Sequence, residues 1–205
     1  MLYESKYKRT LGKYFYNKKV QRSKLVARIP TTSLELIKKS SLEKETKIID
    51  IGGGDSKLVD YLLKDGFTNL TVLDISQTAI NRAKERLGQE SSKVKWIVSD
   101  ILDFKPIEKY DIWHDRASFH FLTQKEEIEK YLGTVKSVVT RAAIIGTFST
   151  EGPKKCSSLE IKQYDEITMK ELFLQAGFKN TECKREDHIT PSGITQNFVF
   201  CKFSK

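Results

Sequence analysis

A hydrophobic stretch that runs into three consecutive glycines is the feature that most constrains this chain. Residues 48–56 read Ile-Ile-Asp-Ile-Gly-Gly-Gly-Asp-Ser, and an apolar helical pattern starts directly afterwards. Glycines at such a turn allow positive φ angles and a close approach of the backbone to a ligand. The helix that follows presents free N–H groups at its start. The pattern predicts a buried first strand, a tight turn and a ligand that contains adenosine.

The spacing of the glycines argues against a dinucleotide. The dinucleotide fingerprint is G-x-G-x-x-G with an acidic residue about 20 positions later. Gly52 and Gly54 occupy the first two glycine positions, but Lys57 stands at the third, where a glycine allows close packing of helix and strand. A nicotinamide-dependent oxidoreductase is therefore the weaker alternative.

Each of the first three predicted strands carries an acidic residue at or near its end. These residues are Asp50, Asp74 and Asp100. Because ligands of parallel sheets bind at the carboxyl ends of the strands, we expect all three carboxylates to face one crevice. A ligand with an ammonium group, a ribose and an adenine can use three carboxylates, whereas a pyrophosphate cannot.

Four stretches carry a resemblance to a known family. They are residues 50–56 (DIGGGDS), 72–76 (VLDIS), 113–122 (WHDRASFHFL) and 152–157 (GPKKCS). Over about residues 31–205 the chain resembles the class I S-adenosylmethionine-dependent methyltransferases. It is most similar to a group of small bacterial-type methyltransferases, mostly of unassigned substrate. The first two stretches are general to the superfamily, and the third is much more specific.

The resemblance implies S-adenosyl-L-methionine as the cofactor. It places Asp50 near the amino-acid end of the cofactor, Asp74 on the ribose and Asp100 near the adenine. The expected cofactor-binding residues are Asp50, Gly52, Gly53, Gly54, Ser56, Asp74, Ile75, Asp100, Ile101 and His114. No metal site is expected, because the histidines and cysteines lack metal-ligand spacing.

The sequence departs from that group in two places. Residues 25–27 (Leu-Val-Ala) stand where the group has a Trp-Tyr-Gln-like segment, ahead of Pro30. This change affects the region expected to cover the active site and leaves the acceptor open. Residues 139–142 (Val-Thr-Arg-Ala) replace a Pro-Gly-Gly turn before the fifth strand. There we expect only a surface turn.

Apolar residues repeat with strand and helix periods in turn, and glycines and polar turn residues separate these segments. This alternation predicts one α/β domain. We expect a Rossmann-like, doubly wound, seven-stranded sheet that is mostly parallel with one antiparallel edge strand. The expected strands cover residues 47–51, 70–74, 93–98, 110–113, 142–148, 178–187 and 195–203. The expected helices begin near residues 32, 55 and 76 and at two capping boxes, residues 123–126 and 168–171.

The positive charge is concentrated at the amino terminus. The net charge is +9, and residues 1–28 contain nine basic residues and one acidic residue, interleaved with tyrosines. We therefore divide the chain into a basic, aromatic-rich arm (residues 1–30) and a methyltransferase domain (residues 31–205). Such an arm can contact RNA or a protein, or it can pack as a helix on the domain.

Composition narrows the class of protein further. No apolar run approaches the length of a membrane span, so no membrane partner is expected. Three widely spaced cysteines, Cys156, Cys183 and Cys201, predict a reducing compartment and no disulfide scaffold. A cytoplasmic location follows from these two observations.

The region around the fourth strand supplies the candidate catalytic residues. Methyl transfer from a sulfonium depends mainly on orientation, and a hydroxyl or ammonium acceptor also needs a base. The candidates are His114, Asp115, Arg116 and His120. Each has a structural alternative: the histidines can bond loop backbone, and Arg116 can pair with Asp115 or Asp100.

Residues further along the chain are candidates for binding the acceptor. They are Phe119, Cys156, Tyr164, His188 and Gln196. For Phe119 the alternative is a core side chain, and for Cys156 it is a small buried hydrophobe. The leading prediction is methyl transfer to a small-molecule acceptor. The alternatives are a protein lysine or RNA recruited by the arm, or a non-catalytic partner protein that keeps the fold.

Overall fold

The computed structural model describes residues 29–156, 158–179, 181–190 and 193–205. All but the last two residues of the predicted arm, and with them the departure at residues 25–27, lie outside this range. The division into an arm and a domain therefore stays a prediction. In the part of the chain that is described, no helix is both long and apolar enough to span a membrane.

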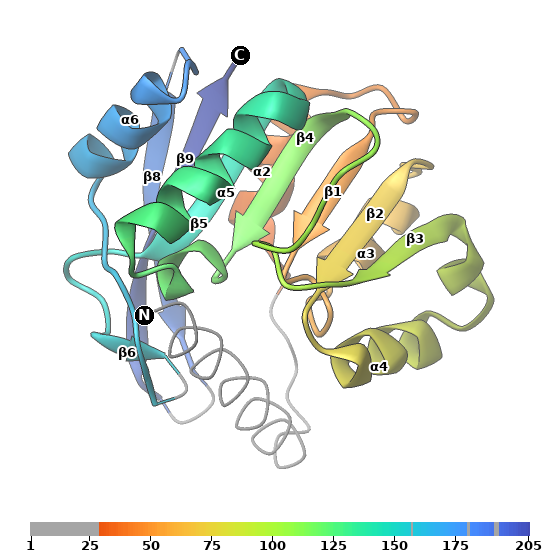
Figure 1. Cartoon of the computed structure of the whole chain (residues 1–205). Coiled ribbons are helices and arrows are strands. Elements are labelled where there is room, and N and C mark those ends of the chain that lie inside the picture. Colours follow the sequence, from red (N-terminus) through yellow and green to blue (C-terminus); the bar gives the residue numbers. More distant parts are fainter. Residues whose placement is uncertain (1–28, 157, 180, 191–192) are drawn as a thin grey trace.

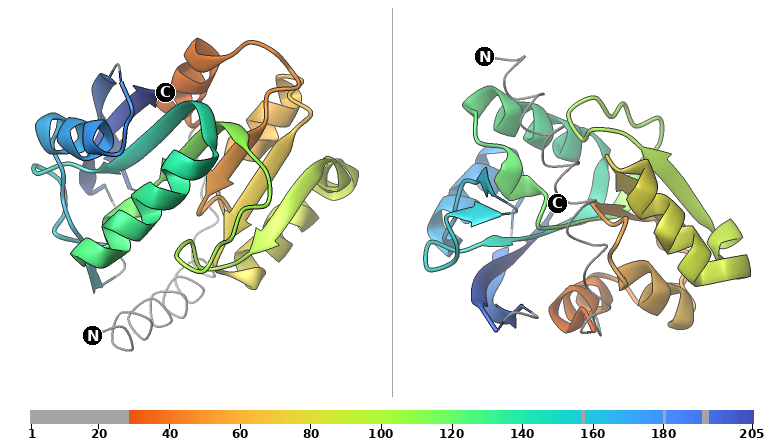
Figure 2. Two further views of the ribbon diagram at one scale, coloured as in Figure 1. Left: turned by 45° about the horizontal axis from the view of Figure 1, so that its top comes forward. Right: turned by 90° about the horizontal axis from the view of Figure 1, so that it is seen from below.

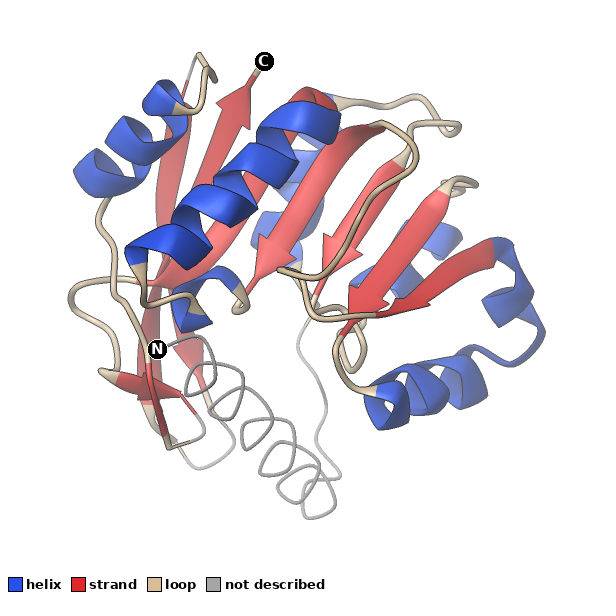
Figure 3. Ribbon diagram, viewed as in Figure 1, coloured by secondary structure: helices blue, strands red, loops and turns tan. Residues whose placement is uncertain are grey.

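Helices and strands alternate along the chain, as the apolar periods predicted (Figure 3). The seven strands of the main sheet are β1 (Ile48–Ile51), β2 (Leu70–Asp74), β3 (Val94–Val98), β4 (Tyr110–Arg116), β5 (Val139–Phe148), β8 (Thr181–Ile189) and β9 (Thr195–Ser204). The α-helices are α2 (Thr31–Ser40), α3 (Leu58–Lys64), α4 (Gln77–Leu87), α5 (Lys125–Val138) and α6 (Glu166–Gln175). The 3-10 turns η1 (Gly88–Lys93) and η2 (Phe119–Phe121) and a small hairpin of β6 (Lys155–Cys156) and β7 (Leu159–Glu160) complete the described elements.

The main sheet has the strand order β3-β2-β1-β4-β5-β9-β8 (Figure 1). Strands β1 to β5 pair in parallel, and β9 pairs antiparallel with both β5 and β8. A mostly parallel, seven-stranded sheet with antiparallel pairing at one edge was predicted and is confirmed. The reversed strand is β9, and β8 forms the outer edge.

Two buried clusters hold the helices to the two faces of the sheet. On one face Trp113 of β4 packs with Tyr131 of α5 and Phe173 of α6. On the other face Leu36 of α2 and Leu58 of α3 belong to the second cluster. Figures 1 and 2 show α5 and α6 on one side of the sheet and α2 and α3 on the other. Strands β1 and β2 are buried at every residue, as strands covered on both faces must be.

The local details correct three predictions. Helix α5 has its capping box at Gln124 and Glu127, one residue later than expected. Helix α6 is capped by Asp165, whose side chain accepts from the Thr168 backbone, so this helix starts three residues earlier than the predicted box. The surface turn expected at residues 139–142 is absent, because α5 ends at Val138 and β5 begins at the next residue.

The cysteines also differ from the prediction. Cys183 and Cys201 face each other on β8 and β9 and form a disulfide. Cys156 is free. A reducing compartment was predicted on the assumption that the cysteines are unpaired. That assumption is wrong for Cys183 and Cys201. Their pairing depends on the hairpin register, which the spacing of 18 residues does not reveal.

Candidate functional site

The site predicted from the sequence lies at the carboxyl ends of β1, β2 and β4, at the lower edge of the sheet in Figure 1. Asp50 is opposite Val72 of β2 on one side and His114 of β4 on the other. Asp74 is the last residue of β2 and is opposite Val98 of β3. The parallel register therefore brings the ends of four strands together, as expected.

The three glycines after β1 wrap around two buried carboxylates. Gly52 has φ +69°, a conformation that favours glycine. A Cβ at Gly53 would lie 2.3 Å from Asp50 Oδ2, and one at Gly54 would lie 2.8 Å from Asp74 Oδ2. The Gly54 backbone N–H donates to Asp74 Oδ2 at 2.9 Å. Glycine is thus needed because the backbone passes directly over the carboxylates.

A buried chain of polar groups holds Asp50. Its Oδ1 accepts from His114 Nδ1 at 2.6 Å, and His114 Nε2 lies 2.9 Å from the hydroxyl of Ser33 in α2. In the neutral ring with the proton on Nδ1, Nε2 accepts from that hydroxyl. Both ring nitrogens of His114 are used, so this residue positions Asp50. Asp50 Oδ2 is buried with no partner among the described residues.

The other predicted cofactor residues have backbone partners. Asp74 is 6% exposed and also accepts from the Ser76 backbone at 2.7 Å. Burial raises the pKa of Asp74, and the two backbone hydrogen bonds oppose the shift. Asp100 Oδ1 accepts from the Leu102 backbone at 2.9 Å. Ser56 Oγ accepts from the backbone at the start of α3.

Asp115 faces away from this site. Consecutive residues of a strand point to opposite faces, so Asp115 lies on the α5 side while His114 lies on the α2 side. Its carboxylate accepts from the Tyr131 hydroxyl at 2.8 Å and from the Ser118 and Phe119 backbones at 3.1 Å. Burial raises the pKa of Asp115 to about 6. These contacts give Asp115 a structural role in ending β4, where the prediction was a catalytic one.

Two buried side chains near the start of α5 and α6 have unpartnered polar atoms. Both ring nitrogens of His120 and the hydroxyl of Tyr164 have no partner among the described residues. His120 stacks on Phe148 with ring centroids 4.7 Å apart. Burial lowers the pKa of His120 to about 3 and raises the pKa of Tyr164 well above its ordinary value. Neither group is poised to exchange a proton near neutral pH.

Arg116 is the last residue of β4, on the same face as Asp50 and His114. Its guanidinium carbon lies 5.3 Å from the ring centre of Phe198 on β9. The next residue, Ala117, has φ +66°, which is unusual for a residue other than glycine. The chain therefore leaves β4 in a strained turn beside the glycine loop.

The predicted acceptor-binding residues do not form one group. Phe119 is fully buried in the core, 4.9 Å from the ring of Tyr131. Cys156 lies half-buried in β6. His188 and Gln196 are opposite each other in the β8–β9 hairpin, and both are half-buried. Phe119 is thus a core residue, which was the alternative, and the others stay predictions.

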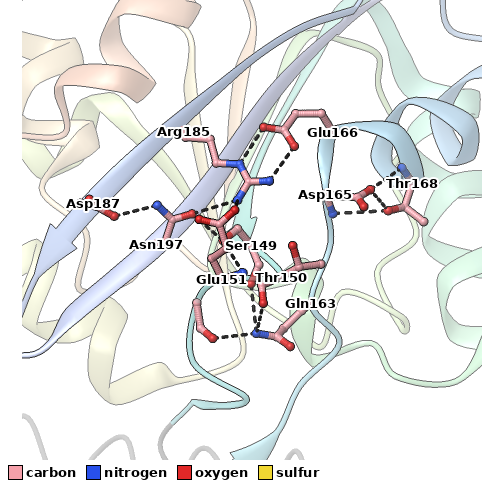
Figure 4. Close-up of polar contacts among 11 residues, drawn as sticks. Ser149, Thr150, Glu151, Gln163, Asp165, Glu166, Thr168, Arg185, Asp187 and Asn197 are labelled. Atoms are coloured by element: carbon pink, nitrogen blue, oxygen red, sulfur yellow. Dashed lines mark hydrogen bonds and ion pairs between the residues drawn. The ribbon is translucent and has the colours of Figure 1, made fainter.

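Figure 4 shows how the loop after β5 is fixed to its neighbours. Arg185 of β8 donates to both carboxylate oxygens of Glu166, at 2.7 and 2.8 Å, and to Glu151 at 3.0 Å. Gln163 donates to the Gly152 carbonyl at 2.7 Å. These contacts hold the loop between the hairpin and α6, beside the end of β5. Sequence reasoning did not find this network, since its members are far apart in the chain.

A separate cavity of about 680 Å³ lies between α5 and the loop after β3. Residues 102–106 line one side, and Lys130, Thr134 and Ser137 line the other. None of the predicted site residues lines it, so we place the site by the strand ends and not by this cavity.

Residues 48–142 match a family model described as a methyltransferase domain. A malonyl-[acyl-carrier protein] O-methyltransferase 1 from Ilyobacter polytropus is 30% identical over 114 residues, 55% of this chain and 40% of the relative. A malonyl-[acyl-carrier protein] O-methyltransferase from Anoxybacillus flavithermus is 34% identical over 82 residues, 39% of this chain and 30% of the relative. The chain thus spans less than half the length of these curated relatives.

Two solved structures share the fold across most of the chain. One is the 1,6-didemethyltoxoflavin-N1-methyltransferase of Burkholderia thailandensis with 1,6-didemethyltoxoflavin and S-adenosylhomocysteine bound. It matches with a TM-score of 0.73 and 15% identity, and the match covers 99% of this chain and 89% of that one. The other is the N-methyltransferase NodS of Bradyrhizobium japonicum WM9 with S-adenosylhomocysteine, with a TM-score of 0.68, 16% identity and coverage of 85% and 86%. At these identities the likeness shows the fold alone, which is the Rossmann-like fold predicted from the sequence.

Proposed function

Because the chain belongs to the class I S-adenosylmethionine-dependent methyltransferases, we propose that it transfers the methyl group of S-adenosylmethionine to a small-molecule acceptor. One observation carries this proposal. The glycine loop passes over Asp50 and Asp74 so closely that neither Gly53 nor Gly54 can carry a Cβ. We propose that a ligand with ammonium and ribose groups lies against this loop at the ends of β1 and β2.

The residues present fit S-adenosylmethionine. Asp50 Oδ2 is buried and unpartnered among the described residues, so it suits the ammonium group of the amino-acid end. Each carboxylate oxygen of Asp74 accepts one backbone hydrogen bond and retains a lone pair for a ribose hydroxyl. Asp100, at the end of the next strand, is proposed near the adenine, with Ile75 and Ile101 beside it. The cofactor supplies an electrophilic methyl group on a sulfonium.

The contribution of this chain is mainly orientation. Ser33 and His114 fix Asp50, and Asp50 in turn fixes one end of the cofactor. The Gly52–Gly54 loop covers the carboxylates of Asp50 and Asp74. Arg116 and the turn at Ala117 border the space beyond β4, where an acceptor would approach. We propose no general base, because the nitrogens of His114 are occupied and the carboxylate of Asp115 faces the other side of the sheet.

The relatives support a low-molecular-weight acceptor group without identifying it. By their names, two act on malonyl carried by an acyl-carrier protein and one on 1,6-didemethyltoxoflavin. Recruitment of RNA or a protein lysine by the basic arm is the competing hypothesis, and the arm lies outside the described residues. A non-catalytic partner is the third, and the intact Asp50, Gly54 and Asp74 argue against it. A cytoplasmic location remains part of the proposal.

Calorimetric titration with S-adenosylhomocysteine, with NAD as control ligand, tests the proposal. We expect micromolar binding of S-adenosylhomocysteine and no binding of NAD. Asp74→Ala should weaken binding at least about tenfold, because it removes a charged acceptor of hydrogen bonds. Asp65→Ala, at a surface ion pair with Lys38, is the matched control and should not change affinity. Equal affinity of wild type and Asp74→Ala would contradict the ribose assignment, and binding of NAD alone would reject the family function.

The ionic strength of the assay separates the two acceptor classes. If RNA is the acceptor, its affinity for the full chain should fall steeply with salt, in proportion to the number of phosphates contacted. A small-molecule acceptor predicts no binding of a generic RNA at 150 mM salt and unchanged turnover when residues 1–28 are removed. Loss of turnover on that truncation, with S-adenosylhomocysteine binding retained, would favour the macromolecular acceptor.

A further inference from the structure

The cavity between α5 and the loop after β3 lies apart from the strand ends at which the cofactor is proposed. Its volume is about 680 Å³, within the range of about 300–1,000 Å³ that is typical of small-molecule sites. Figure 1 shows this loop running from β3 back to the start of β4 alongside α5. None of the residues proposed for methyl transfer lines the cavity. A molecule bound here would therefore be a second ligand, separate from the cofactor and its acceptor.

The cavity has an apolar floor. Leu102 is buried, and Phe104 packs half-buried against the core on this face of the sheet. On the facing helix, Gly133 and Thr134 lie four and three positions before Ser137, so the three share one face of α5. An added Cβ at Gly133 would meet no atom within 4 Å. Small residues on α5 therefore leave room for a ligand above an apolar surface.

Lysines border the cavity on both sides. Lys105 belongs to the loop and Lys130 to α5, and both are exposed. Neither forms an ion pair with a residue that the structure describes. Asp103 is the acidic residue of the lining, so the lining retains an excess of positive charge. Residues 29–205 contain 27 basic and 26 acidic residues, and this excess is therefore a local feature of a nearly neutral domain.

Further lysines make the carboxyl-terminal end of α5 positive as well. Lys109 Nζ donates to the Ser137 carbonyl, and Lys205 Nζ donates to the Lys136 carbonyl at 2.6 Å. These ammonium groups satisfy carbonyls at the end of the helix, but a carbonyl carries only a partial charge and does not neutralise them. Burial lowers the pKa of Lys205, and the charges of Lys136 and Lys109 lower this pKa further. The end of the cavity near Ser137 therefore also favours an anion.

The type of side chain in the lining favours phosphate over carboxylate. Lysine binds phosphate as a point charge, whereas the planar fork of arginine matches a carboxylate, and the lining contains no arginine. A phosphate monoester carries a charge of about −1.5 to −2 at pH 7 and three acceptor oxygens. Two lysines on opposite walls can supply donors to those oxygens. The apolar floor requires that the ligand also carries an apolar group, because inorganic phosphate would leave that surface uncovered.

We propose that this cavity is a second ligand site and that it binds a phosphate monoester of an apolar alcohol. Lys105 and Lys130 hold the phosphate from two sides, and Leu102 and Phe104 contact the apolar group. A soluble phosphate ester and a lipid with a phosphate headgroup share this chemistry, and the experiment below distinguishes them. The site does not depend on the proposed methyl transfer.

Calorimetric titration of the full chain with phenyl phosphate tests the proposal, at one ionic strength set with sodium chloride. We expect phenyl phosphate to bind at least about tenfold more tightly than inorganic phosphate or benzoate, and phenol not to bind. Replacing both Lys105 and Lys130 by glutamine should weaken phenyl phosphate binding at least about tenfold, because charge-assisted hydrogen bonds are lost. Lys170→Gln, at an exposed position of α6 outside the cavity, is the matched control and should behave as wild type.

A second variant separates the cavity from its charges. Ser137→Trp fills the cavity while both lysines remain, and it should abolish binding of phenyl phosphate. All four replaced lysine and serine side chains are exposed, so the melting temperature of each variant should stay close to that of wild type. Unchanged affinity in the double lysine variant or in Ser137→Trp would overturn the proposal. Equal affinity for phenyl phosphate and inorganic phosphate, or tighter binding of benzoate, would also overturn it.

Vesicles of phosphatidylcholine with and without phosphatidic acid identify the source of the phosphate. Cosedimentation that requires phosphatidic acid and is lost in the double lysine variant assigns the cavity to a lipid headgroup. Phenyl phosphate binding without such cosedimentation assigns it to a soluble ester. Absence of both would reject the site. Binding of S-adenosylhomocysteine is measured separately, so failure of this inference and failure of the proposed function can be told apart.

Discussion

Replacement of His114 by alanine separates the structural role assigned here from the catalytic role that the sequence suggested. His114 Nδ1 lies 2.6 Å from Asp50 Oδ1, and the two side chains are 1% and 5% exposed. The variant would leave both oxygens of a buried carboxylate without a partner among the described residues, which typically costs about 3–5 kcal/mol. The lost hydrogen bond to Ser33 adds about 1 kcal/mol. We therefore expect the free energy of unfolding to fall by about 4–6 kcal/mol.

Urea unfolding followed by circular dichroism measures this change. His188→Ala, in the half-buried hairpin position, is the matched histidine control and should lower the free energy of unfolding by less than about 1 kcal/mol. In a double-mutant cycle, Asp50→Asn with His114→Ala should cost at least about 1 kcal/mol less than the sum of the single changes, because the residues are in contact. If His114→Ala unfolds like wild type but abolishes turnover, His114 is a catalytic base and the structural reasoning is refuted.

Three further predictions concern stability. Gly146→Ala should lower the free energy of unfolding by about 1–3 kcal/mol, because its Cβ would lie 2.3 Å from an aromatic ring of β9. Gly133→Ala, with open space around it within α5, should raise the free energy of unfolding by up to about 1 kcal/mol. If urea unfolding shows the same change for both variants, the packing described around Gly146 is contradicted. The pKa of Asp115 is raised on folding to about 6, so its charged form opposes folding. Its contribution to the free energy of unfolding should therefore fall as pH rises from about 4 to about 6. Asp115→Asn should flatten the curve of stability against pH in that window, and an unchanged slope would exclude this carboxyl as the source. Reduction of the Cys183–Cys201 disulfide should lower the free energy of unfolding by about 3 kcal/mol, and thiol alkylation of the unreduced, denatured protein should modify neither of the two if the bond forms in solution.

The sequence alone determined the order of the main strands and helices and located the glycine loop after the first strand. Runs of apolar residues separated by glycines located the strands that carry Asp50 and Asp74, because burial on both faces of a parallel sheet demands continuous apolar runs. The glycine loop was recognisable since its constraint is local: three adjacent residues must do without a Cβ. The helix starts were less exact, because several polar residues near each start can serve as the cap.

Only the tertiary structure decided what the residues around β4 do. His114, Asp115 and Arg116 are adjacent in the chain and appeared equally suited to catalysis. The pleat sends Asp115 to the α5 face and leaves the other two on the α2 face, where His114 meets Asp50 and Ser33, 64 and 81 residues away. The same long-range packing pairs Cys183 with Cys201 and gives Arg116 no carboxylate partner among the described residues. The local sequence pattern determines which residues can form a strand. The hydrogen-bond partners and the burial of each side chain depend instead on which distant segments the sheet brings beside that strand.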